Sequence, residues 1–206
     1  MDEYIGQVLD CLEQSGLSEN TIVIYQPDHG HSTETRAFGG GGNAGPYRGA
    51  KFSVFEGGIR VPSVVRYPKE FPKGKTRQQF MTSCDWFPTL CEMCQVELPA
   101  CKLDGVSLVK VLKEDAPQPR ESFYWQMGSG KNPQWAIREG GWKLIGNPRD
   151  TTLPQSKQVN SGKMKEKLFL VNLDQDPGEQ TNLVETLPKK VKMLMELRDE
   201  LVTEFQ

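Results

Sequence analysis

The sequence predicts an α/β fold that is followed by a smaller antiparallel α+β region. Residues 2–16 have the apolar spacing of an amphipathic helix, and a short loop joins them to an apolar run at 21–25 that is typical of a buried strand. Helix, loop and strand in this order form an α/β unit. A proline-rich polar stretch at 116–120 precedes several short aromatic-rich segments and a last helix. We therefore expect two regions, 1–115 and 116–206.

The first region contains two helices and two strands by the same criteria. The apolar residues of its first helix recur at helical spacing: Ile5, Val8, Leu9 and Leu12. A second short strand is expected at 62–67 and is ended by Pro68. A further helix is expected at 82–94, with Ser83 or Asp85 as its N-terminal cap.

The second region reads as short strands followed by a helix. The expected strands are 122–127, 134–138, 142–145 and 168–173. The polar segment 149–167 is expected to be a loop, and Lys189–Phe205 has the pattern of an amphipathic helix. Strands that are followed by a helix indicate a small antiparallel α+β subdomain.

Composition limits the classes of function. The 206 residues carry 25 Lys and Arg against 27 Asp and Glu, so the net charge of −2 gives no electrostatic reason to expect nucleic acid or an anionic membrane as a partner. No apolar run is long enough to span a membrane, and no secretory signal pattern begins the sequence. The cysteine count is 5, so at least one thiol has no partner within the chain.

The best candidate for a site is the tripeptide Asp28-His29-Gly30, which closely follows the strand at 21–25. Ligands of open α/β sheets gather beyond the carboxyl ends of the strands. A carboxylate suits a hard divalent cation such as Ca²⁺ or Mg²⁺, whereas imidazole is a less usual ligand for calcium. The alternative is that Asp28 caps a turn and that His29 is incidental.

A glycine-rich loop follows this tripeptide. There are 6 glycines between residues 39 and 49, and the loop ends at Arg48 and Lys51. Such a segment lets backbone approach a ligand closely, although a flexible surface loop has the same composition.

These pieces, taken with others farther along the chain, resemble the second half of the sulfatase family. The matching pieces, in family order, are Asp28-His29-Gly30, Arg48-Gly-Ala-Lys51, Phe55-Glu-Gly-Gly-Ile-Arg60-Val-Pro62, Asp85-Trp-Phe-Pro88-Thr-Leu90, Asp104-Gly-Val-Ser-Leu108 and Leu168-Phe-Leu-Val171-Asn-Leu-Asp-Gln-Asp176-Pro-Gly-Glu179-Gln-Thr-Asn182-Leu183. The resemblance covers nearly the whole chain. It implies part of an alkaline-phosphatase-like sheet with flanking helices, and then the small α+β subdomain.

The resemblance also implies roles for particular residues. Asp28 and His29 match metal ligands, for Ca²⁺ or Mg²⁺, and Lys51 matches the catalytic lysine that touches the sulfate. A fixed ammonium near a sulfuryl oxygen offsets the charge that develops as the S–O bond breaks. His31 could contact the sulfate or a sugar hydroxyl, or be an ordinary surface histidine. Arg48 could bind substrate, or instead pair with a carboxylate such as Glu56 or Asp28.

The family's nucleophile motif is not found at any cysteine of this chain. In the family a formylglycine is made from Cys or Ser within C/S-x-P/A-x-R; its hydrated aldehyde attacks sulfur, the alcohol leaves, and the sulfate is then eliminated. No cysteine here is followed two positions later by Pro or Ala. The expectation is a C-terminal half whose formylglycine belongs to a missing N-terminal half. The parent enzyme would hydrolyse sulfate esters of a sugar or polysaccharide and be exported to the periplasm, the exterior or a lysosome.

The sequence allows three other interpretations of its function. The cysteines with zinc-like spacing are Cys84, Cys91, Cys94 and Cys101. A zinc site is disfavoured because Cys91 and Cys94 fall on the apolar face of the helix expected at 82–94, where cysteine packs as a small hydrophobe. The remaining two are a phosphodiesterase or phosphoglycerol transferase of the same superfamily, and a non-catalytic remnant or binding protein.

Overall fold

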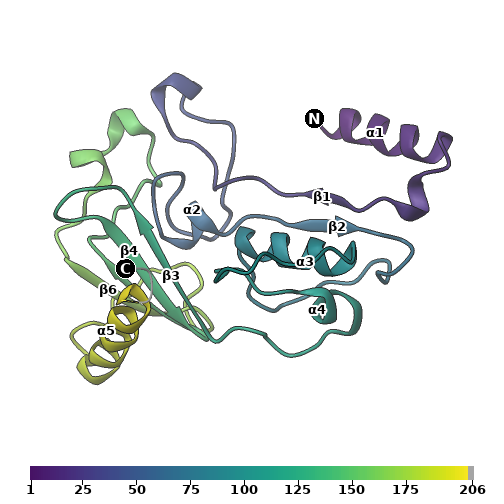
Figure 1. Ribbon diagram of the computed structural model, residues 1–206. Helices are drawn as coiled ribbons and strands as arrows, with labels where there is room; N and C mark the ends of the chain where they lie inside the picture. The colour runs from purple at the N-terminus through teal and green to yellow at the C-terminus, as the bar shows by residue number, and fades with distance from the viewer. Residues whose placement is uncertain (204–206) are drawn as a thin grey trace. The chain divides into compact units, whose positions relative to one another are not determined.

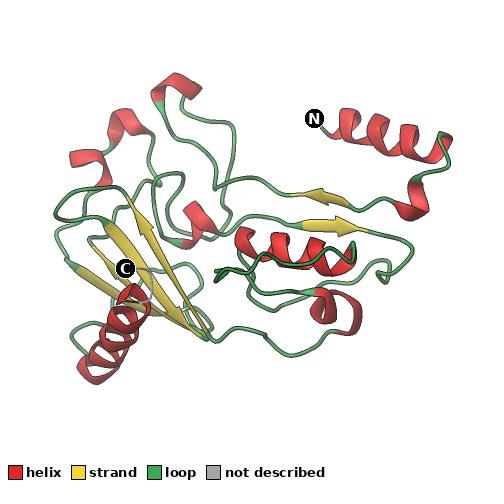
Figure 2. Cartoon of the chain, viewed as in Figure 1, coloured by secondary structure: helices red, strands yellow, loops and turns green. Residues whose placement is uncertain are grey.

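The computed structural model describes residues 1–203, and its contacts divide the chain into two compact units. Unit 1 comprises residues 1–25 and 63–120, and unit 2 comprises residues 26–62 and the chain from 121 onward. Figure 1 labels the elements of both units along the chain, and Figure 2 shows that the segment 26–62 is mostly loop.

The segment 26–62 is where this division differs from the expected regions, 1–115 and 116–206. Its buried polar groups are matched by residues far along the chain: the Thr33 hydroxyl donates to the Thr151 carbonyl at 3.2 Å, and the Val54 N–H donates to Gln134 Oε1 at 3.1 Å. A glycine-rich loop has few apolar side chains with which to build its own core, so it depends on such contacts for burial.

Unit 1 is built from three helices and one small sheet. Helix α1 spans Asp2–Gln14, β1 spans Val23–Tyr25, β2 spans Val64–Arg66, α3 spans Trp86–Met93 and α4 spans Val109–Glu114. The sequence predicted α1, α3 and both strands, but it did not predict α4.

Unit 1 has the mixed helix and strand content that the sequence predicted, but its sheet is small and antiparallel. Strands β1 and β2 pair antiparallel, with Val23 opposite Arg66 and Tyr25 opposite Val64. The chain leaves β1 at Tyr25 and re-enters the sheet at Val64, so it returns at the same end of the pair. Parallel neighbours require a crossover to the opposite end, and the chain makes none between these two strands.

Asp85, one of the two caps expected from the sequence, occupies the N-cap position of α3, although its side chain makes no capping hydrogen bond to that helix. The N-terminal cap of the preceding 3₁₀ turn, Ser83–Asp85, is Thr82, which forms a capping box with Asp85. Asp85 is fully buried and also pairs with Arg120 at 2.6 Å. The Asp85 carboxylate takes part in both the capping box and the ion pair. These contacts satisfy it in the protein interior, where water does not reach it.

Unit 2 contains an antiparallel sheet in which consecutive strands are neighbours. Its strands are β3 (Ser122–Met127), β4 (Gln134–Glu139), β5 (Trp142–Gly146) and β6 (Leu168–Asn172). Helix α5 (Pro188–Thr203) packs on one face through a cluster that includes Leu144, Leu170 and Leu194. The antiparallel α+β subdomain is therefore confirmed; the expected helix end at Phe205 lies outside the described residues.

The opposite face of this sheet is covered by residues of the segment 26–62. Val54 and Phe55 are buried with Ala136, Ile145 and Phe169 in one cluster. Phe55 precedes the short helix α2 (Glu56–Ile59) and meets Phe169 edge to face, with ring centroids 5.2 Å apart. This packing fixes the loop that carries Lys51 against the sheet.

In residues 1–203 no helix is both long and apolar enough to cross a membrane.

Candidate active site

The turn Asp28-His29-Gly30 is held against helix α2 by glycine contacts. The Gly30 N–H donates to the Gly58 carbonyl at 2.9 Å. A Cβ at Gly30 would lie 1.9 Å from the Gly57 carbonyl oxygen, so only glycine permits this approach. The two sequence pieces that carry the family resemblance, Asp-His-Gly and Glu-Gly-Gly, therefore touch through their backbones.

Asp28 and His29 lie side by side at the surface of unit 2. His29 Nε2 is 3.1 Å from Asp28 Oδ2, and the Asp28 side chain is 85% exposed. In the Nδ1–H tautomer, His29 donates to the Gly30 carbonyl at 2.8 Å. A backbone carbonyl that holds Nδ1–H leaves Nε2 as a free ligand beside a carboxylate, which is the arrangement of many metal-binding histidines.

This donor pair fits part of a metal shell. Calcium takes six to eight oxygen-rich ligands, and two donors cannot supply these. Across residues 1–203 no group of three or more His, Cys, Asp and Glu side chains could hold an ion. Asp28 and His29 would hold a divalent cation only together with ligands from elsewhere.

The Lys51 loop is attached directly to this turn. The Lys51 N–H donates to the His31 carbonyl at 2.9 Å, and its ammonium Nζ is 3.0 Å from Glu34 Oε2. Glu34 also receives hydrogen bonds from Arg36 Nε at 2.8 Å and from the Ser32 hydroxyl at 3.1 Å. Hydrogen bonds from Arg36, Lys51 and Ser32, in that order of size, lower the pKa of Glu34 to about 2. Three donors therefore converge on the Glu34 carboxylate, in the loop that follows the proposed metal ligands.

His31 directly follows the Asp28-His29-Gly30 turn, and its carbonyl accepts the hydrogen bond from the Lys51 N–H. Within the described chain its ring Nδ1 is buried and has no hydrogen-bond partner. Its Cβ lies so close to Gly42 that a side chain there would come within 2.3 Å. His31 thus offers one uncommitted polar atom near the Lys51 backbone, whereas Glu34 and Arg36 are committed to one another.

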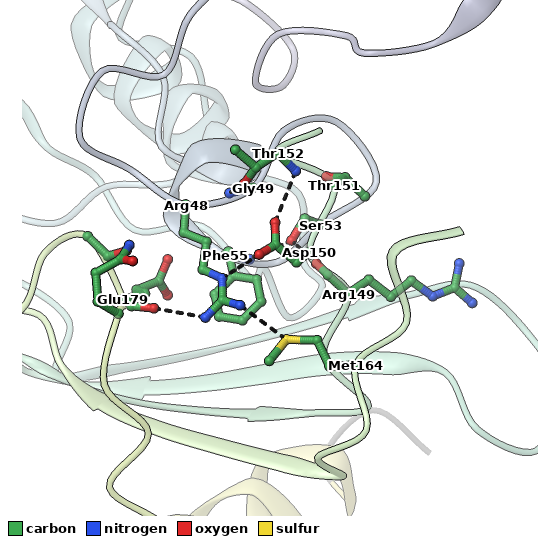
Figure 3. Close-up of polar contacts among 12 residues, drawn as sticks. Arg48, Gly49, Ser53, Phe55, Arg149, Asp150, Thr151, Thr152, Met164 and Glu179 are labelled. Atoms are coloured by element: carbon green, nitrogen blue, oxygen red, sulfur yellow. Dashed lines mark hydrogen bonds and ion pairs between the residues drawn. The ribbon is translucent and has the colours of Figure 1, made fainter. Parts of the chain in front are cut away.

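Arg48 extends into the core of unit 2, among Phe55, Asp150 and Met164 (Figure 3). Its Nε donates to Asp150 Oδ2 at 2.7 Å, its Nη1 to the Glu179 carbonyl at 3.1 Å, and its guanidinium lies 4.6 Å from the centre of the Phe55 ring. The carboxylate partner is Asp150, not the Glu56 or Asp28 considered from sequence. The structure gives Arg48 a full set of contacts within the fold.

A buried charge cluster, missed by sequence reasoning, lies beneath helix α2. Lys143 Nζ is 2.8 Å from Glu56 Oε1 and 2.9 Å from Glu179 Oε1, and the Lys143 side chain is 0% exposed. The Glu56 N–H also donates to Glu179 Oε2 at 2.5 Å. We refer to Glu56, Lys143 and Glu179 as the buried triad.

The two carboxyl groups of the buried triad have opposite pKa shifts. Burial, assisted by the charge of Glu56, raises the pKa of Glu179 to about 7 despite Lys143. For Glu56, burial also acts to raise the pKa, but the charge and hydrogen bond of Lys143 outweigh it and the pKa is lowered. Near neutral pH one lysine thus neutralises Glu56, and Glu179 exchanges its proton in the physiological range.

The four cysteines with zinc-like spacing differ in their exposure. All five cysteines are free thiols, and only Cys91 is buried. Cys91 packs in the interior as expected, whereas Cys94, which was expected on the same apolar face, is exposed.

Comparison with known proteins identifies the family. The pattern of the family "Sulfatase" matches residues 1–96, and that of "N-sulphoglucosamine sulphohydrolase, C-terminal" matches residues 49–206. The second match covers most of the chain. The protein belongs to the sulfatase family.

Individual relatives agree with this assignment. A sulfatase of Formosa agariphila is 31% identical over 231 residues, which cover 98% of this chain and 38% of the relative. A structure of a protein in complex with its substrate D-glucosamine-2-N,6-O-disulfate is 25% identical with a TM-score of 0.73, and the match covers 99% of this chain and 38% of that one. A sulfatase from Pseudoalteromonas sp. shares the fold with a TM-score of 0.80 at 22% identity, covering 98% and 40% of the two chains. The chain therefore spans about two fifths of the length of these proteins.

Proposed function

We propose that this chain forms the C-terminal part of a sulfatase that hydrolyses sulfate esters of a sugar or polysaccharide. The observation that carries the proposal is the attachment of the Lys51 loop to the Asp28-His29-Gly30 turn, since the Lys51 N–H binds the His31 carbonyl at 2.9 Å. Family membership and the substrate of the structural relative named above support the choice of a sulfated sugar. By the same family reasoning, the parent enzyme is an exported protein.

Lys51 takes the role of the sulfate-binding cation in this proposal. Its ammonium already holds one anionic oxygen, that of Glu34, at 3.0 Å. A sulfate group would compete with Glu34 for this contact and would receive a fixed positive charge as the ester bond breaks. His31 offers its unpartnered Nδ1 to the same substrate. Arg48 has a structural role in the proposal, because it holds the loop to Asp150 and Glu179.

Asp28 and His29 contribute two ligands to a divalent cation, Ca²⁺ or Mg²⁺, in the proposed enzyme. When bound, such an ion polarises sulfate oxygens and stabilises charge on them. The His29 Nδ1–H bond to Gly30 keeps Nε2 available for this purpose. The formylglycine and the other ligands come from outside this sequence in the proposal, so we expect the 206-residue chain alone to be inactive.

The test has a genetic and an enzymatic part. The DNA upstream of Met1 is read in frame for a C/S-x-P/A-x-R motif, and the protein encoded by the whole frame is assayed with an aryl sulfate and a sulfated sugar. In that protein Lys51→Ala is expected to lower kcat about 10²–10³-fold, as the loss of an electrostatic contact to a transition state does. Lys75→Ala, at an exposed lysine of unit 1, serves as the matched control.

Two results would contradict the proposal. Aryl sulfate turnover by the 206-residue chain alone would show that no outside nucleophile is needed. A stop codon without the motif, or a complete protein that cleaves phosphate diesters but no sulfate ester, would favour the remnant or the phosphodiesterase interpretation.

A further inference from the structure

A strongly basic segment of unit 2 has no part in the site described above. Between Arg149 and Lys167 the chain has five cationic residues and only two anionic ones, although the whole chain has a net charge of −2. The cationic residues are Arg149, Lys157, Lys163, Lys165 and Lys167. We call these five residues the basic ribbon.

The backbone of this segment folds into two antiparallel stretches, 147–150 and 162–167. The Asn147 N–H donates to the Lys167 carbonyl at 2.8 Å, and the Asp150 N–H donates to the Gly162 carbonyl at 2.7 Å. Arg149 and Lys163 are direct bridge partners. Directly opposite residues of an antiparallel pair project to the same face, so these two cations lie beside each other.

The other face of the two stretches is turned to the protein core. Met164 packs against the cluster that contains Val54 and Phe55, and its sulfur accepts a hydrogen bond from Arg48 at 3.7 Å. Pro148, next to Arg149, is buried. Arg149 and Lys163 therefore project from the side that the core does not use, and the other three lysines of the basic ribbon are exposed.

None of the five cations is neutralised by a carboxylate within the described residues. The four lysines of the basic ribbon are exposed. Asp150 points inward to Arg48, and the Arg149 side chain extends away from that pair in Figure 3. Glu166 is the one exposed carboxylate of the segment. Unpaired cations at this density attract polyanions by displacing counterions.

The segment is also bound to the loop of the candidate active site. The Thr151 hydroxyl donates to the Ala50 carbonyl and accepts from the Ala50 N–H, both at 3.0 Å. The Thr152 hydroxyl accepts from the Gly49 N–H at 2.8 Å. The residue before Lys51 is thus tied to the chain two positions from Arg149, so an extended ligand could contact both features of unit 2.

We propose that the basic ribbon binds the sulfated polysaccharide chain beyond the ester that is cleaved. The choice of a sulfated polysaccharide rests on the proposed function, whereas the existence of the binding surface rests on its own geometry. Sulfate groups remain ionised at every physiological pH, and they recur along such a chain. Several cations on a short stretch of backbone therefore engage several anions at once, and each contact adds to the affinity of the others.

The test compares two triple variants of the chain. Lys163→Gln, Lys165→Gln and Lys167→Gln together remove charge from the basic ribbon. The matched control, Lys73→Gln with Lys75→Gln and Lys131→Gln, removes the same charge from exposed lysines elsewhere. Binding to a heparin oligosaccharide is measured at two salt concentrations, and circular dichroism verifies that both variants are folded.

We expect the ribbon variant to bind heparin about tenfold to a hundredfold more weakly, with a slope of log K against log salt that is shallower by about 2. The control variant should stay within about twofold of the wild type. Equal losses in the two variants, or no loss in the ribbon variant, would overturn the proposal.

Two further measurements are needed. One compares different classes of polyanion as ligands, and the other tests the basic ribbon independently of the proposed function. Equal affinity for heparin, for single-stranded DNA of equal charge and for anionic vesicles would show a surface for polyanions in general, and would overturn the choice of a sulfated polysaccharide. The ribbon variant should keep its kcat on an aryl sulfate, which is too small to reach the basic ribbon, whereas Lys51→Ala should lower that kcat in the complete enzyme about 10²–10³-fold. If the complete protein binds heparin but cleaves no sulfate ester, the proposed function is refuted, and the proposal that the basic ribbon is a binding surface still stands.

Discussion

Two lysines of unit 2 show how differently the same side chain is used. Lys143 is 0% exposed and lies between two carboxylates, Glu56 and Glu179, at 2.8 and 2.9 Å. Lys51 is 20% exposed and holds one carboxylate, Glu34, at 3.0 Å. The first lysine has no alternative partner, because water does not reach it. The second can exchange its partner for an anion from solution.

The difference has an energetic side. A buried ion pair contributes modestly as a whole, but the loss of one partner leaves a charge without water or a counter-charge. A pair near solvent lacks this penalty, since water and salt replace the missing partner. The buried triad therefore fixes the position of helix α2, and the Lys51 pair leaves the candidate site adaptable.

The strongest test of this comparison is Lys143→Met. Two buried carboxyl groups would lose their cation, so we expect a loss of about 3–5 kcal/mol in the free energy of unfolding. Urea denaturation at pH 7 measures it, with Lys189→Met at an exposed lysine as the control. A loss near that of the control would mean that the triad does not stabilise the fold.

A smaller effect is expected from pH. The folded-state pKa of Glu179, about 7, lies above the ordinary value of 4.5, so its contribution to stability is present below pH 4.5 and is lost as the pH rises through 7. Between pH 5 and 8 the wild type should lose on the order of 2 kcal/mol from this group. Glu179→Gln cannot titrate and should show a flatter profile in the same denaturation series. Parallel profiles for the two proteins would exclude Glu179 as the source.

The smallest effect belongs to the site itself. Lys51→Met should lower the stability by only a fraction of the loss seen in Lys143→Met, because solvent replaces its partner. It should raise the pKa of Glu34 from about 2, and Arg36→Met should raise it further, since the Arg36 hydrogen bond is the larger cause. NMR titration of the Glu34 carboxyl measures both shifts. The reverse order would show that Lys51 is the main partner of Glu34.

Local signals explain what the sequence predicted well. The strand at 122–127 was predicted with the bounds that β3 has, and β4, β5 and β6 differ by one residue at one end. Aromatic residues between glycine turns are a local signal, so they identify strands without knowledge of the fold. The same holds for α1, whose apolar spacing repeats within its own length.

The features that were missed depend on residues far apart in the sequence. Lys143 occurs next to apolar residues in a strand, and nothing nearby indicates partners 87 and 36 positions away. The antiparallel pairing of β1 and β2 depends likewise on where the chain returns after the segment 26–62. At the candidate site, the adjacency of Asp28 and His29 follows from sequence, but the contact of Lys51 with Glu34 does not.

The insertion of residues 26–62 into the later unit has a consequence for biosynthesis. During synthesis the Lys51 loop emerges before the strands on which it packs, and the hydrogen bond from the Glu56 N–H to the Glu179 carboxylate spans 123 residues. The loop can reach its final conformation only after Glu179 has been translated. Contacts of such high contact order slow folding and prolong the exposure of apolar residues such as Phe55.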